Sequence, residues 1–146
     1  MPMLYPTFNL PTITPRTTPP AVKYYQSPYF DFESGDFVFD PSGKIKMATG
    51  REAFEQWVLK VCMTERGTRL AYSTDIGTEF EAAMKMPSVE AVKSSVVRTI
   101  TESIMCHPCA EWVKNFVFRA EGDSLWVTFD VKGRDWAEAG TLTVKY

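Results

Sequence analysis

The stretch FVFRAEGDSLWVTFDV, residues 116–131, decides the fold of this chain. On both sides of its polar centre, residues 121–124, apolar side chains alternate with polar ones. This period of two is typical of a β-strand that is buried on one face. A short turn that contains glycine joins two such strands into an antiparallel hairpin. The sequence therefore predicts a hairpin in the last third of the chain.

The last six residues continue this pattern and predict a third strand. Leu142, Val144 and Tyr146 would share one face of that strand. A strand at the edge of a sheet presents unpaired backbone groups, to which a strand of another protein can be added. The residues expected to bind a partner in this way are Thr141, Leu142, Thr143, Val144, Lys145 and Tyr146. This arrangement is typical of an assembly protein rather than an enzyme.

Three helices are predicted upstream of the hairpin. The first begins at Thr49, which with Glu52 forms a capping box, and ends near Gly67, a candidate for a left-handed cap. The second and shorter helix runs from a cap at residues 73–75 through Met84, and a brief extended piece at residues 70–72 precedes it. The third helix is long. Its apolar positions recur in steps of three and four, at Val89, Val92, Val96, Ile100 and Ile104.

The first 29 residues differ in kind from the rest, because they hold seven of the ten prolines and no acidic residue. Proline excludes helix and inner strand, so we expect an extended arm, partly in the polyproline-II conformation. Its apolar residues favour contact either with its own domain or with a neighbouring subunit. Residues 30–40 predict a short hairpin, and residues 44–47 another short strand. The aromatic residues expected to face inward in that hairpin are Phe30, Phe32, Phe37 and Phe39.

Together these elements predict an α+β protein, with three main helices packed on a small, mainly antiparallel sheet. We expect two parts, the proline-rich arm over residues 1–29 and a single domain over residues 30–146. The net charge of −2 provides no basic field for nucleic acid. No apolar run approaches the roughly 20 residues that a membrane helix needs. We therefore expect no nucleic-acid partner and no membrane partner.

Cys106-His107-Pro108-Cys109 has the spacing of a redox dithiol, and with Cys62 it could nominally form a zinc site. However, the motif closes a helix, whereas a redox motif stands at a helix N-terminus, where the dipole favours a thiolate. In the structural interpretation, Cys62 and Cys106 are buried small residues and Pro108 stops the helix. We predict neither a metal nor a cofactor.

A second alternative is a hydrolase that uses paired carboxylates. Glu65, Asp75, Glu79 and Glu81 lie close together in the sequence. None of them is set in an apolar stretch that would mark a catalytic acid, and Asp75 is expected to cap a helix. We predict no catalytic residue.

Three motifs and their order resemble a known family. They are DFESGDF at residues 31–37, GREAFEQWVLK at residues 50–60 and TERGTRLAYSTDIGTEF at residues 64–80. With the final helix, its proline junction and the hairpin, they resemble the baseplate wedge or sheath-initiator proteins of contractile phage tails over residues 30–146. The resemblance is greatest to the branch in phages, defective prophages and tail-like bacteriocins of Gram-positive bacteria. The family carries a historical lysozyme-like name, and a peptidoglycan hydrolase is accordingly the alternative function.

The resemblance implies a structural protein, present in six copies in the baseplate of a virion or bacteriocin particle that assembles in the host cytoplasm. Its implied partners are the sheath protein, which it meets by β-strand addition, the helical bundle of the wedge, and the tail tube or hub. The family contacts the wedge through a Glu-Pro-Arg motif, and here that position reads His107-Pro108-Cys109. Because only the proline is kept, we expect a less charged contact that also uses Glu111 and Trp112. We expect the arm to reach a neighbouring component.

Overall fold

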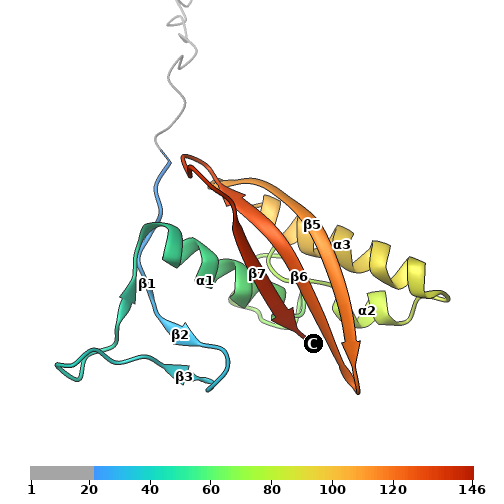
Figure 1. Cartoon of the computed structure of the whole chain (residues 1–146), viewed down its shortest axis with the longest axis horizontal. Coiled ribbons are helices and arrows are strands. Elements are labelled where there is room, and N and C mark those ends of the chain that lie inside the picture. The colour runs from blue at the N-terminus through green and yellow to red at the C-terminus, as the bar shows by residue number, and fades with distance from the viewer. Residues whose placement is uncertain (1–21) are drawn as a thin grey trace, which may run out of the picture.

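The computed structural model describes residues 22–146 (Figure 1). The prediction of an extended arm therefore lies mostly outside the described residues. In chain order the strands and helices are β1 (Ser27–Pro28), β2 (Phe30–Asp31), β3 (Asp36–Phe37), β4 (Met47–Ala48), α1 (Gly50–Cys62), α2 (Phe80–Met84), α3 (Val89–Met105), β5 (Ala110–Glu121), β6 (Ser124–Gly133) and β7 (Gly140–Lys145). The α+β class is confirmed.

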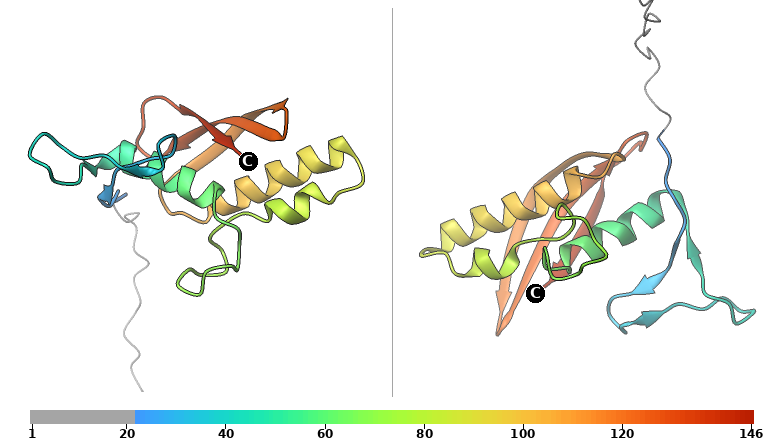
Figure 2. Two further views of the ribbon diagram at one scale, coloured as in Figure 1. Left: turned by 90° about the horizontal axis from the view of Figure 1, so that it is seen from below. Right: turned by 180° about the vertical axis from the view of Figure 1, so that it is seen from behind.

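The main sheet has the antiparallel order β5-β6-β7. α1 and α3 lie against one face of it, as the view in Figure 2 (left) shows. The predicted hairpin is confirmed: Glu121 pairs with Ser124, and Gly122 takes a φ of 58° in the two-residue turn. A positive φ is unfavourable for side chains with a Cβ, so glycine suits this position.

The core lies between the sheet and the helices. Alternation in β6 places Val127, Phe129 and Val131 on the buried face, as predicted. They meet the apolar stripe of α3, in which Val96, Ile100 and Ile104 are completely buried. Residues Phe54 and Val58 of α1 belong to the same cluster. The stripe of α3 is shorter than predicted, because its first member, Val89, is exposed.

The predicted C-terminal end of the first helix and the predicted start of the second are wrong, whereas Thr49 is the N-cap of α1 and α2 ends at Met84, as predicted. Thr49 precedes α1, but its side chain makes no capping hydrogen bond, and α1 ends at Cys62 rather than near Gly67. The second helix begins only at Phe80. The cause is a loop over residues 64–78 that closes on itself. The Thr78 amide donates to the Thr64 carbonyl (2.8 Å) and the Arg66 amide to the Thr78 carbonyl (2.9 Å). Backbone groups used in this way are not available to continue a helix.

The tip of this loop also differs from the prediction. Residues 70–72 form turns rather than an extended piece, and the Leu70 side chain is fully exposed.

The N-terminal hairpin is present, with Phe30 opposite Phe37. Only half of its predicted aromatic face is covered, since Phe37 and Phe39 are 43% and 57% exposed. The hairpin lies beside α1 and outside the main sheet (Figures 1 and 2), so among the described residues no second layer of sheet covers it. The strand predicted at residues 44–47 is displaced to β4, which pairs with β1. Among the described residues, no helix is both long and apolar enough to cross a membrane.

Candidate functional site

β7 is an edge strand, and within the described part of the chain it pairs only with β6. The Tyr146 amide donates to the Leu125 carbonyl (2.9 Å), and the Leu125 amide donates to the Tyr146 carbonyl (3.0 Å). In an antiparallel pair such doubly bonded positions recur at every second residue. Val144 and Leu142 therefore also turn their backbone groups toward β6. The N–H and C=O groups of Thr141, Thr143 and Lys145 consequently point away from the sheet, along an open edge.

The opposite edge of the sheet is irregular. Between Lys114 and Val117, β5 holds one residue more than β6, which is a β-bulge. Asn115 takes a φ of 59° there, and its amide nitrogen donates to the Asp130 carboxylate (2.8 Å). A bulge interrupts the ladder and increases the local twist, which hinders the pairing of a further strand. The regular open edge therefore belongs to β7.

A groove of about 610 Å³ lies beside this edge. Thr143 and Lys145 of β7 form one wall of the groove, and β2 with the residues after it forms the other. Leu59 of α1 and Met63, the residue directly after this helix, also line the groove, and Met63 is 51% exposed. The groove thus combines unpaired backbone groups with an apolar surface, which is the combination that an added strand requires.

The junction of α3 and β5 carries the other predicted partner-binding residues, and it does not present them all to solvent. The His107 ring packs against Trp57, with ring centroids 4.4 Å apart, and its Nδ1 accepts a hydrogen bond from the Cys109 amide (3.0 Å). Burial lowers the pKa of His107. Cys109 is buried and its Sγ donates to the Lys23 carbonyl (3.3 Å), whereas Pro108 is exposed.

Glu111 and Trp112 follow on β5. Glu111 is exposed and forms an ion pair with Lys132 (3.1 Å). Trp112 is half-buried, with the Lys114 ammonium 4.9 Å from the centre of its ring. Of the five residues predicted here, Pro108, Glu111 and Trp112 therefore reach the surface most directly.

The arrangement of the cysteines differs from the expectation that Cys62 and Cys106 are both buried. Cys62 is buried as predicted, but Cys106 is exposed and Cys109 is buried in its place. Cys109 belongs to the core cluster, although Pro108 before it is exposed. Burial raises the pKa of all three thiols, in the case of Cys62 to about 12. A raised pKa opposes the thiolate that redox chemistry needs. Among the described residues, no group of three or more potential metal ligands occurs.

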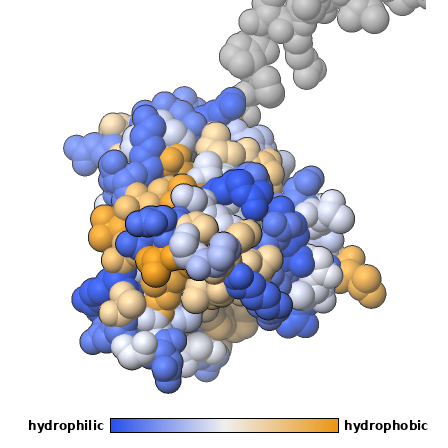
Figure 3. Space-filling model, turned by 90° about the vertical axis from the view of Figure 1, so that its right-hand side faces the viewer, coloured by the Kyte–Doolittle hydropathy of each residue, from blue (hydrophilic) through white to orange (hydrophobic). Residues whose placement is uncertain are grey.

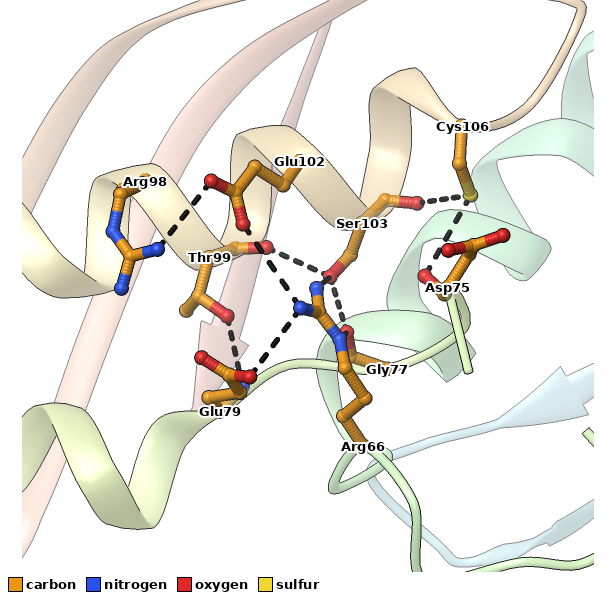
Figure 4. A network of polar contacts seen from close by, with 9 residues as sticks. All are labelled: Arg66, Asp75, Gly77, Glu79, Arg98, Thr99, Glu102, Ser103 and Cys106. Carbon is orange, nitrogen blue, oxygen red and sulfur yellow. Dashed lines mark hydrogen bonds and ion pairs between the residues drawn. The ribbon is translucent and has the colours of Figure 1, made fainter. Parts of the chain in front are cut away.

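None of the acidic residues considered for hydrolysis, Glu65 among them, lines the groove beside β7. Glu79 is 3.5 Å from the Arg66 guanidinium, and Asp75 contributes its carbonyl to a contact with Cys106 (Figure 4). Glu81 is exposed on α2. These positions are those of structural and surface groups.

Arg66 lies at the centre of a network that the sequence reasoning missed (Figure 4). Its Nε donates to the Gly77 carbonyl (3.2 Å) and its Nη2 to the Ser103 hydroxyl (3.1 Å). The Ser103 hydroxyl also bonds the Gly77 carbonyl, and Thr99 Oγ1 accepts from the Glu79 amide (2.8 Å). The network fastens the loop over residues 64–78 to α3. The sequence signal that could have indicated this network is the pair Thr99 and Ser103, whose hydroxyls lie four residues apart beside the apolar stripe of α3.

One further surface is mixed in character. At the α2–α3 end of the molecule, hydrophobic residues stand among hydrophilic ones (Figure 3), and Met84, Met86 and Val89 are exposed in this region. Single exposed apolar residues of this kind are common on protein surfaces.

Residues 27–135 match the model of the contractile injection system sheath initiator family. No curated protein matches the chain. Among solved structures, the chain is similar to one in the 6-fold symmetrised cryo-EM structure of the anti-feeding prophage baseplate. The TM-score is 0.49 and the identity 18%, over 83% of this chain and 85% of that chain. The family match covers more than half of the sequence and agrees with the resemblance of its motifs. The chain belongs to the sheath-initiator family of contractile injection systems.

Proposed function

We propose that this chain is a structural baseplate protein that joins the wedge to the sheath and templates the first sheath ring by β-strand addition. The observation that carries this proposal is the regular open edge of β7 beside a groove. The N–H and C=O groups of Thr141, Thr143 and Lys145 would form the ladder with a sheath strand. Backbone hydrogen bonds of this kind fix the register of the partner as well as binding it.

The groove also constrains the sheath strand. Alternate side chains of that strand would cover Leu59 and the exposed part of Met63. On the far wall stand Asp31 and Glu33, and no basic side chain among the described residues of that wall lines the groove. A strand with alternating apolar residues and at least one lysine or arginine would suit this surface.

The wedge contact is proposed for the junction of α3 and β5. Pro108, Glu111 and Trp112 would meet the helical bundle, while His107 and Cys109 hold the junction from inside through their shared hydrogen bond. The same proposal includes six copies in the ring of a tail particle that is assembled in the host cytoplasm. It also includes a division of the chain at residue 29 and an arm that reaches a neighbouring component. Membership of the branch of Gram-positive bacteria stays a prediction.

The decisive experiment is Thr143→Pro in baseplates that are then supplied with sheath protein. Proline removes the N–H of residue 143, which points to the open edge and not to β6. Electron microscopy should therefore show assembled baseplates without sheath. Thr143→Ala is the matched control, since it loses the same side-chain contact with Thr128 (3.0 Å) but keeps the N–H, and it should nucleate sheath.

Sheath growth on Thr143→Pro baseplates would overturn the proposal. Deletion of residues 141–146 is a weaker test, because it also removes Val144 and the Tyr146 ring from the core.

A further inference from the structure

A second pocket, of about 600 Å³, is not used by the proposed function. It lies between α1 and the extended chain that precedes and includes the N-terminal hairpin. Its walls are largely aromatic, with Tyr25, Phe30, Phe37, Phe54, Trp57 and His107 among them. Tyr25 is 72% exposed and Phe37 43%. Among the described residues that line it none is acidic, and Lys60 carries the one fixed charge.

Grooves lined by aromatic side chains bind proline-rich segments in the polyproline-II conformation. Such a segment has three residues per turn and leaves its carbonyl groups without internal partners. His107, which lines the pocket, is the candidate donor for them. Since Nδ1 of His107 accepts from the Cys109 amide, the neutral ring carries its proton on Nε2.

The chain itself contains a segment of this chemistry at residues 2–11, PMLYPTFNLP. Pro2, Tyr5, Phe8 and Pro11 recur at intervals of three residues, so a polyproline-II helix of this sequence would carry them on one face. No side chain of this segment is charged. The segment therefore loses no ion hydration on entering a pocket without acidic groups.

The covalent connection makes binding within one chain geometrically possible. Residues 12–21 form a connection of ten residues, which spans up to about 33 Å when extended. The segment itself would be about 30 Å long. The described chain begins beside the pocket, because Tyr24 and Tyr25 line it. A short tether gives an effective concentration in the millimolar range, and a stiff segment loses little entropy on binding.

We propose that residues 2–11 of the same chain bind in this aromatic pocket as a polyproline-II segment, with Pro2, Tyr5, Phe8 and Pro11 against Trp57 and Phe37.

The test uses the full chain with a nitroxide attached at Thr7→Cys, in a Cys106→Ser background that leaves only the two buried cysteines. Residue 7 is not on the proposed binding face. NMR spectra of the ¹⁵N-labelled chain should show broadening of the Trp57 indole and the Phe37 amide, whereas the Asp123 amide in the β5–β6 turn should stay sharp. Reduction of the nitroxide should restore the signals.

Matched variants locate the binding face. Tyr5→Ser with Phe8→Ser should abolish the broadening, whereas Asn9→Ser with Thr12→Ser, which lie off that face, should leave it unchanged. No broadening at Trp57 in the parent chain would overturn the proposal, as would broadening that survives Tyr5→Ser with Phe8→Ser.

A mixed sample distinguishes the same chain from a second copy. Here the nitroxide is on a chain without ¹⁵N, and the ¹⁵N chain carries none. Broadening in this sample would assign the pocket to the segment of another copy and overturn binding within one chain. Because no sheath or baseplate is present, the outcome is independent of the proposed strand addition.

Discussion

Arg66 joins two parts of the chain, because it bonds both Gly77 of its own loop and Ser103 of α3. We predict that Arg66→Lys lowers the free energy of unfolding by about 1–3 kcal/mol, because a lysine cannot supply the several donors of a guanidinium at once and leaves a buried acceptor unpaired. Urea denaturation measures this change.

Arg119→Lys is the matched control for that substitution. Arg119 pairs with Glu121 at 3.0 Å, but the two side chains are 70% and 68% exposed. Exposed pairs contribute little, so we expect a change within about 0.5 kcal/mol. Equal losses in the two variants would contradict a special role of the Arg66 network.

His107 should make stability depend on pH. Burial lowers its pKa in the folded state below the ordinary value of 6.5, so the unfolded state binds the proton more readily. Stability is then fully present above pH 6.5 and falls as the pH drops through the folded pKa. We predict a larger loss of unfolding free energy between pH 7.5 and 5.5 for the parent than for His107→Gln.

The measurement is urea denaturation of both proteins at each pH. Histidine occurs once in the sequence, so no other imidazole contributes to the difference. If the parent and the variant had the same pH dependence, burial would not lower the pKa of His107 enough to affect the free energy of unfolding.

At the scale of single elements, the two long helices begin in different ways. Ser88 Oγ accepts a hydrogen bond from the Ala91 amide (3.1 Å) at the start of α3, whereas the Thr49 side chain makes none at the start of α1. We predict that Ser88→Ala lowers the free energy of unfolding by about 0.5–2 kcal/mol. Thr49→Ala should cost clearly less, and thermal unfolding followed by circular dichroism compares the two. A larger loss for Thr49→Ala would reverse this assignment.

The elements that the sequence predicted best are those whose own periodicity matches their burial. β6 and α3 are examples. Alternate side chains of β6, and every third or fourth side chain of α3, pack directly in the core. α2 was predicted too long, since the start of its region pairs with residues 64–66, a contact that no local pattern indicates. Phe37 and Phe39 were misplaced for a similar reason. Alternation predicts that they share a face, but it does not show whether another layer covers it.

The candidate site could be predicted in outline only. The alternation of residues 141–146 indicated a strand, but its edge position and its open backbone groups follow from the order β5-β6-β7, which depends on tertiary pairing. The Asn115 bulge and the groove beside β7 also needed the structure. At the junction, residue types indicated a turn at Pro108, whereas the inward orientation of His107 and Cys109 depends on the distant Trp57 and Lys23.

At the scale of the whole molecule, Tyr146 holds the sheet to the helices. Its ring stacks on Phe80 of α2 with centroids 3.8 Å apart, and its hydroxyl donates to the carbonyl of Cys62 (2.8 Å). Burial raises the pKa of this phenol. We predict that Tyr146→Ala lowers the free energy of unfolding by about 3–5 kcal/mol, through the loss of a packed ring.

Tyr146→Phe separates the ring from its hydroxyl. It should cost only about 1 kcal/mol, because the ring stays and one hydrogen bond is lost. Denaturation midpoints of the two variants and the parent give the comparison. Similar losses for both variants would mean that the hydroxyl, and not the stacking, holds the last residue in place.

The bulge at Asn115 gives the molecule a direction. A subunit with two regular edges could be incorporated anywhere in a polymer of strands and would extend it from either end. If a sheath strand is added at β7 as we propose, the interrupted edge of β5 would leave this subunit one such neighbour, which suits the start of a polymer and not its interior. A seed of this kind sets both the origin and the polarity of growth without being consumed into the body of the filament.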